Sequence, residues 1–442
     1  MRVFIVLLTL LTTVPLHAQT DNAYSLKQAI EYTLTHQMTI LNAVADEEKA
    51  VAQKNEVRGT GLPQVNASFD FKDFVERPTN LLPAEFFGGQ PGEFIPVQFG
   101  TKYNATASLE VSQLLFSGEY IVALQSSSTY IELSQKMTRR TREEAVIAVT
   151  KSYYSVLVNE ERLTLVAENL GQLEKLKNET EAGYKAGFIE KIELDRLTVS
   201  YNNLEAELQN LRKMVSLGYA MLKFQMGMDL SEPLTLSDSL DENTVREINV
   251  SQDDFDYENR SEVQLLNTQL QLSKQNMKRY KYGYAPSLLA YGNLSAQAQR
   301  NEFDFFTNGK WYPIGIIGLT MRVPIFDGLQ RNYKIQQTRF DVIKLENNRA
   351  NLQKGIDLEL ETARIGLENS LVVLDNRKEN IALARSIFDV AGKKFSAGTG
   401  SSMEVIAAET ALMEAQANYY NALYGALIAK TEYQKAKGTI LE

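Results

Sequence analysis

The chain has no cysteine among its 442 residues and only 10 prolines and 25 glycines. The lack of cysteine excludes disulfide scaffolds, thiolate metal sites, iron–sulfur clusters and thiol nucleophiles. Because so few residues favour turns, the chain is expected to form long secondary-structure elements. A formal net charge of -9 argues against a general nucleic-acid binder, which would carry a basic surface.

Sequence motifs for catalysis and nucleotide binding are also missing. There are two histidines, no pair of them at helical metal-ligand spacing, no GxSxG turn around a nucleophilic serine, and no phosphate-binding loop. We therefore expect no enzymatic activity, no cofactor and no metal site.

The N-terminus is typical of a secretory signal peptide over residues 1–18. Arg2 is followed by an apolar run over residues 3–11, and the small residue Ala18 precedes the expected cleavage point. The alternative is a transmembrane anchor, although the run is short for a bilayer. No cysteine follows that could carry a lipid, and charges interrupt every other long apolar stretch. The sequence thus predicts an exported protein and fits a bacterial envelope.

Most of the remaining chain has the pattern of long helices. Between residues 190 and 217 apolar residues alternate at spacings of three and four, which is the pattern of a coiled-coil seam. This seam comprises Leu194, Leu197, Tyr201, Leu204, Leu208, Leu211 and Val215. Similar seams follow Gly328 and precede the C-terminus. Taken alone, each seam is interpreted as the core-facing stripe of an intramolecular bundle.

Four short segments alternate apolar and polar residues at period two instead. They lie at about 64–75, 103–113, 287–298 and 312–325. A strand with one apolar and one polar face is typical of a transmembrane barrel, but also of a soluble sheet with one wet face. The segments at 76–102 and 300–313 are expected to be surface loops rich in aromatic residues, and aromatic residues beside strand ends favour the membrane interpretation.

The same order of elements occurs twice, about 210 residues apart. Each copy comprises a helix, two strands joined by a loop, and a long helical hairpin with a tight turn. We expect the first copy at 19–227, with its hairpin at about 119–227, and the second at 263–442, with its hairpin at about 328–438. We expect the acidic segment 228–262 between them to be a linker or an equatorial region. Repeated residues at the strand–helix junctions are Pro63, Phe116, Gly118, Pro286, Phe326 and Gly328, and those at the hairpin turns are Ala186, Gly187, Ala397 and Gly398.

This duplicated arrangement resembles the TolC-like outer-membrane efflux protein family, over nearly the whole chain after residue 24. The resemblance implies a mostly α fold with a membrane β-barrel portion. In it, three chains would contribute four strands each to a twelve-stranded outer-membrane barrel, and long helical hairpins to a periplasmic α-barrel. It implies a homotrimer, a periplasmic adaptor protein that docks on the helical tips, and an inner-membrane transporter that supplies the energy.

The resemblance also implies a gate at the helical tips. Glu404 corresponds to an acidic ring at the constriction, and Glu193 to an acidic partner of the gate; either could instead be an ordinary solvated glutamate. The tyrosine and arginine that lock the gate in relatives are replaced by Phe395 and Gly400. The lock would then depend on apolar closure by Phe395 or on lysines near the tips, which are Lys185, Lys191, Lys393 and Lys394.

The sequence thus predicts a passive exit duct of a tripartite efflux or secretion system in the outer membrane. The competing hypothesis is an exported coiled-coil surface protein without channel activity. That hypothesis accounts for the helices and the acidity, but it does not account for two strand pairs at equivalent points of a duplication.

Overall fold

The computed structural model describes residues 23–240, 242–246, 255–307 and 309–441, so the expected signal peptide lies outside the described residues. These described residues divide into two compact units, one within residues 23–44, 138–261 and 352–441, the other within residues 45–137 and 262–351. The helices are α1 (Leu26–His36), α2 (Met38–Gly59), α3 (Gly118–Lys185), α4 (Lys191–Met226), α5 (Asn243–Arg246), α6 (Ser261–Tyr282), α7 (Gln330–Ser396) and α8 (Ser402–Lys437). The strands are β1 (Ala23–Tyr24), β2 (Gln64–Asp73), β3 (Thr79–Pro83), β4 (Phe94–Gln98), β5 (Tyr103–Phe116), β6 (Thr235–Leu236), β7 (Ser287–Arg300) and β8 (Tyr312–Arg322).

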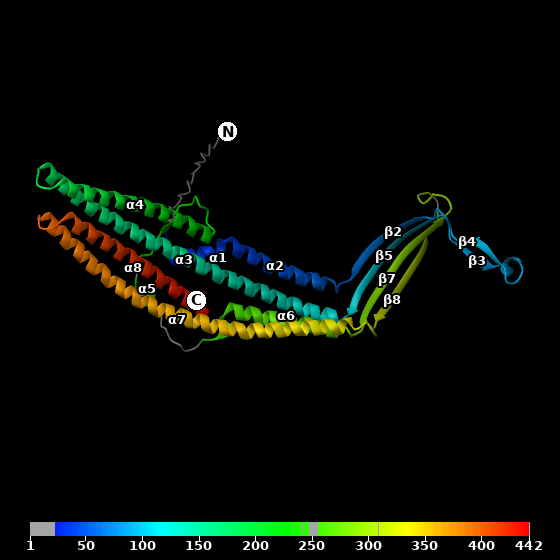
Figure 1. Cartoon of the computed structure of the whole chain (residues 1–442). Helices are drawn as coiled ribbons and strands as arrows, with labels where there is room; N and C mark the ends of the chain where they lie inside the picture. Colours follow the sequence, from blue (N-terminus) through cyan, green and yellow to red (C-terminus); the bar gives the residue numbers. More distant parts are fainter. Residues whose placement is uncertain (1–22, 241, 247–254, 308, 442) are drawn as a thin grey trace, which may run out of the picture. The chain divides into compact units, whose positions relative to one another are not determined.

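The first unit is helical, and its core lies between two long hairpins, α3–α4 and α7–α8 (Figure 1). The seam expected on α4 is where that helix buries its side chains: Leu197, Leu204, Leu208 and Leu211 are all buried in one cluster. A second cluster joins α7 to α8 through Phe388, Val405 and Leu412. Helices of this length depend on such packed stripes, because intrinsic propensity contributes little stability to an isolated helix in water.

The segment between the two copies has short elements in this unit. β6 pairs in parallel with β1, and α5 follows. Val245 of α5 is buried in the largest hydrophobic cluster, which also contains Tyr153 and Leu367. Residues 247–254 of this segment lie outside the described residues.

The second unit contains a four-stranded antiparallel sheet in the order β2-β5-β7-β8 (Figure 1). β2 and β5 come from the first copy and β7 and β8 from the second, so the duplication meets at the β5–β7 pairing. β8 ends at Arg322, two residues before Pro324, which has no N–H for a strand ladder. β5 runs to Phe116 and is longer than expected, with a register shift between Leu114 and Phe116.

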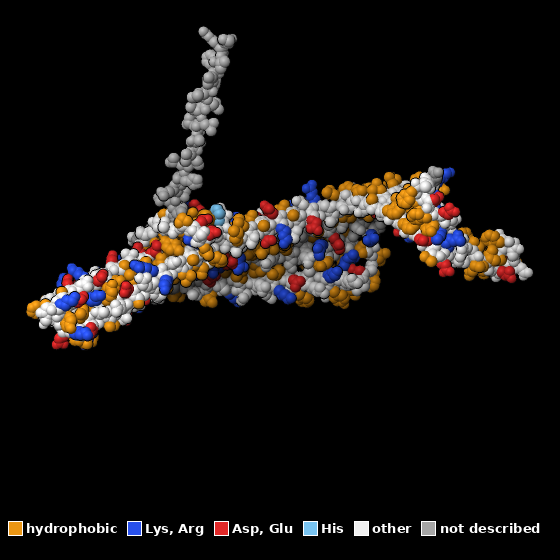
Figure 2. Space-filling model, turned by 90° about the horizontal axis from the view of Figure 1, so that it is seen from above, with side chains coloured by type: hydrophobic (Ala, Val, Ile, Leu, Met, Phe, Trp, Pro, Cys, Tyr) orange, Lys and Arg blue, Asp and Glu red, His pale blue; other side chains and the backbone are white. Residues whose placement is uncertain are grey.

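The faces of this sheet differ in chemistry. One face carries exposed apolar side chains from all four strands: Val65, Phe69, Phe71, Leu109, Val111, Leu294, Ile317, Leu319 and Met321. The opposite face carries Asn66, Ser68, Asp70, Lys72, Thr106, Ser108, Glu110, Asn293, Ser295 and Gln297. Ile314 and Ile316 of β8 are exceptions on this polar face. Figure 2 shows hydrophobic side chains gathered over the strands.

The expected loop at 76–102 contains a second, two-stranded sheet formed by β3 and β4, with a 3-10 helix at Ala84–Phe87. Aromatic residues of the other loop pack at the end of the main sheet: the ring of Phe71 lies 5.7 Å from Phe303 and 5.6 Å from Phe305. Among the residues that the structure describes, no helix is both long enough and apolar enough to cross a membrane.

Candidate functional site

The turns of the two long hairpins are built alike. Gly187 follows α3 with φ +81°, and Gly398 follows α7 with φ +74°, a left-handed conformation that costs glycine little. Equivalent backbone hydrogen bonds close the two turns, such as those from Phe188 N–H to the Gly183 carbonyl and from Thr399 N–H to the Lys394 carbonyl. The residues before these glycines, Ala186 and Ala397, are exposed.

Glu193 links the two hairpins near their turns. It lies in the first turn of α4, and its carboxylate accepts a hydrogen bond of 2.7 Å from the Ser402 backbone N–H at the start of α8. Arg196 lies 3.2 Å from the other carboxylate oxygen. The first N–H groups of a helix have no partner within it, so Glu193 satisfies one of them with a favourable charge. The hydrogen bond from Ser402 lowers the pKa of Glu193.

Glu404 has different surroundings. It lies in the first turn of α8, where Ser401 is the N-cap and its hydroxyl accepts a bond of 3.4 Å from the Glu404 N–H. Its side chain is exposed. The structure therefore places Glu193 in a contact between the two copies, and Glu404 at a solvated surface of the same helical end.

Phe395 packs within the chain. It is half-buried and packs against both the α4 cluster and the α7–α8 cluster, as does Leu176 of α3. Of the lysines considered for a lock, Lys185 pairs with Glu181 at 2.7 Å. Lys191, Lys393 and Lys394 are exposed.

Two further polar contacts between the copies were not predicted from the sequence. Ser200 of α4 donates a hydrogen bond of 2.6 Å to Glu409 of α8, and Asn169 of α3 donates one of 2.7 Å to Gln416. Glu409 is only 2 % exposed, its second carboxylate oxygen has no partner, and burial raises its pKa. The sequence of α8 gives a signal for Glu409 and Gln416. Both occupy positions of a seam with alternating spacings of four and three residues, which comprises Val405, Glu409, Leu412, Gln416 and Tyr419.

A groove of about 500 Å³ runs between α4 and α8 just behind the turns. Its lining includes Ile192 and Val199 of α4 and Met403 of α8, which are 48 %, 59 % and 55 % exposed. Apolar side chains this open to solvent at the end of a helical pair form a surface suited to contact with another protein.

The junction residues lie where strands meet helices. Phe116 ends β5, Gly118 begins α3, and Pro286 precedes β7; Pro63, Phe326 and Gly328 are exposed beside their strands. A Cβ at Gly118 would lie 2.7 Å from the Tyr282 carbonyl oxygen, so the close approach of α3 to the end of α6 requires glycine there.

Comparison with known proteins agrees with this geometry. Residues 257–439 match the family model described as outer membrane efflux protein. The chain is 18 % identical to outer membrane protein TolC of Vibrio cholerae over 91 % of its length and 88 % of the relative's. It is 20 % identical to the Escherichia coli protein of the same name, over 96 % of its length and 84 % of the relative's.

Among solved structures, the Campylobacter jejuni CmeC outer membrane channel has the same fold, with a TM-score of 0.73 at 15 % identity. The match covers 95 % of this chain and 86 % of that one. In its second half the chain thus matches the outer membrane efflux protein family, it is similar to TolC proteins over most of its length, and it has the fold of a solved outer membrane channel.

Proposed function

We propose that three copies of this chain form a passive exit duct through the outer membrane, as part of a tripartite efflux or secretion system. The observation that carries the proposal is the four-stranded sheet, which is apolar on one face, polar on the other and unpaired at both edges among the described residues. Unpaired strand edges are not tolerated in lipid, and four strands are too few to close a barrel. Three copies would supply twelve strands around a polar lumen.

The helical hairpins would extend this duct into the periplasm and close it at their turns. Three exposed Glu404 side chains would lie at the narrowest ring, where negative charge concentrates cations. Glu193 would hold the two hairpins of one chain together through Ser402 in place of the missing tyrosine and arginine. Phe395 would support this end by packing rather than by lining the opening.

A periplasmic adaptor protein would bind at these tips and draw the hairpins apart. The groove between α4 and α8 offers it an apolar surface beside Gly187 and Gly398. Energy would come from an inner-membrane transporter through the adaptor, because the chain has no nucleotide-binding motif of its own.

Conductance in planar lipid bilayers tests the duct. The detergent-purified chain should insert as a trimer and give discrete single-channel steps, and trimers denatured by boiling should give none. An outer-membrane fraction should retain the protein until detergent is added, and unboiled samples should migrate as an oligomer in gels.

The alternative of a coiled-coil surface fibre makes the opposite predictions. A fibre would be released without detergent and would give no conductance steps. The exposed apolar face of the sheet favours the duct, because a fibre in water would leave that face unburied.

A further inference from the structure

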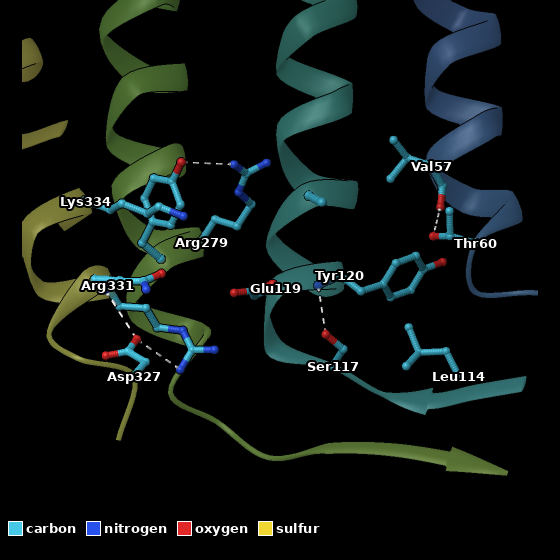
Figure 3. Close-up of a pocket in the computed structure, with 13 residues that line it drawn as sticks. Val57, Thr60, Leu114, Ser117, Glu119, Tyr120, Arg279, Asp327, Arg331 and Lys334 are labelled. Atoms are coloured by element: carbon cyan, nitrogen blue, oxygen red, sulfur yellow. Dashed lines mark hydrogen bonds and ion pairs between the residues drawn. The ribbon is translucent and has the colours of Figure 1, made fainter. Parts of the chain in front are cut away.

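A pocket of about 610 Å³ lies at the strand–helix junction of the second unit, lined by residues of α2, β5, α3, α6 and α7 (Figure 3). This volume suits a small organic molecule. The pocket lies on the polar side of the sheet: Leu114, which lines it, is an even number of residues from Ser108, Glu110 and Ser112, and alternate residues of a strand share a face.

The two carboxylates that line the pocket, Asp327 and Glu119, both lie near one arginine, Arg331. Asp327 accepts a hydrogen bond from the Arg331 N–H and lies 3.5 Å from its guanidinium. Glu119 approaches the same arginine, since both side chains crowd the point where a Cβ would stand on Gly283. Both carboxylates of the pocket therefore lie beside Arg331.

Two cations remain. Arg279 and Lys334 line the pocket, and among the described residues neither has a carboxylate within 4.0 Å. The Arg279 guanidinium lies 5.2 Å from the ring centroid of Tyr280, and the Lys334 ammonium 5.7 Å from the same centroid. The Arg279 guanidinium also donates a hydrogen bond of 3.5 Å to the Tyr280 hydroxyl, which a dashed line marks in Figure 3.

We propose that Arg279, Lys334 and Tyr280 form a binding site for small organic anions that carry a phosphate or carboxylate group. Arginine and lysine supply charge-assisted hydrogen bonds to such groups, and the tyrosine ring supplies an apolar surface and a hydroxyl beside them. The position of this site in the lumen rests on the proposed duct, whereas binding itself does not.

Calorimetric titration of the purified protein with phenyl phosphate, in a neutral detergent, tests the site. The double variant Arg279→Gln/Lys334→Gln should bind at least about tenfold more weakly, because it removes both charge-assisted contacts to the anionic group. The conservative variant Arg279→Lys/Lys334→Arg should retain binding. Arg349→Gln is the matched control, since Arg349 is an exposed α7 arginine outside the pocket.

Phenol, which lacks the anionic group, should not bind measurably. Equal binding of phenyl phosphate by the double variant, or of phenol by the wild-type chain, would overturn the site. So would binding of phosphatidylglycerol vesicles through the two cations without binding of phenyl phosphate, which would make the ligand a lipid headgroup. If the protein binds phenyl phosphate but gives no conductance, the proposed duct is wrong and the binding site stands. If it conducts but does not bind phenyl phosphate, only the binding site is wrong.

Discussion

Glu193 and Glu409 lie on the same pair of helices in opposite surroundings. Glu193 receives a backbone hydrogen bond and an arginine, so its ionised form is favoured and its pKa is lowered. Glu409 is buried with one serine for a partner, so its ionised form is disfavoured and its pKa is raised. The contact between the two copies should therefore respond to pH through both residues, with opposite signs.

Glu409→Gln should stabilise the protein near neutral pH, by about 1 kcal/mol. The folded-state pKa of Glu409 is raised, so the wild-type chain loses stability as pH rises above the ordinary carboxyl pKa, and an amide does not ionise. Thermal unfolding followed by circular dichroism should give a higher Tm for the variant at pH 7 and equal values below about pH 4. A lower Tm at pH 7 would show that Glu409 is paired more strongly than its contacts indicate.

Glu193→Ala should destabilise the protein by about 1 kcal/mol at pH 7, which is typical of losing a helix cap. Because its folded-state pKa is lowered, this contribution is present above the ordinary carboxyl pKa and is lost as pH falls through the lowered value. The Tm difference from wild type should shrink as pH falls below about 4. The matched control is Glu190→Ala, because Glu190 caps α4 without a side-chain hydrogen bond; equal effects of the two changes would contradict the assigned role.

Glu404→Ala should reduce the preference of the channel for cations, if three copies of this exposed carboxylate line the constriction. The measurement is the reversal potential of single channels in a salt gradient. Glu414→Ala removes another exposed carboxylate from α8 and serves as the control. Unchanged conductance and selectivity in the first variant would rule out the ring.

At the scale of the helices and strands, the spacing of apolar residues in the sequence predicted which side of an element is apolar. The seam predicted on α4 is buried, and the strand alternation separates the apolar and polar faces of the sheet. The β3–β4 ribbon could not be predicted in this way, because Pro83 and Pro96 lie within its strands and proline argues against a strand. Contacts between the copies, such as Glu193 with Ser402, depend on tertiary placement and leave no local pattern, whereas Glu409 occupies a seam position that periodicity could identify.

The hairpin turns depend on backbone conformation that only glycine adopts cheaply. Gly398→Ala should destabilise the protein by about 1 kcal/mol, because its φ of +74° strains a residue with a Cβ. Gly392→Ala, in the interior of α7 with open space around it, should stabilise by about 0.5 to 1 kcal/mol. Chemical denaturation of the two variants compares these signs directly; the same sign for both would contradict the assigned turn.

At the scale of the whole molecule, the proposed duct would complete the sheet by joining the edge strands of neighbouring chains. The two copies within one chain already meet at β5 and β7, which leaves β2 of the first copy and β8 of the second as edges. Because β2 and β8 run in opposite directions, β8 of one chain can continue the antiparallel ladder beside β2 of the next. Repeating this contact around a closed ring joins every edge to another.

Because the chain has no cysteine, introduced cysteines can test the expected contact between β8 of one chain and β2 of the next. Asn66→Cys on the polar face of β2, combined in turn with Ile314→Cys, Ile316→Cys or Thr320→Cys on the same face of β8, should give disulfide-linked dimers and trimers for at least one pair. Each single variant should run as a monomer or a dimer in denaturing gels without reductant. Val65→Cys with Ile316→Cys is the matched control, because these side chains lie on opposite faces of the sheet. If every same-face pair stays unlinked in membranes where the chain is folded, the β2–β8 junction between chains is wrong, and with it the twelve-stranded barrel.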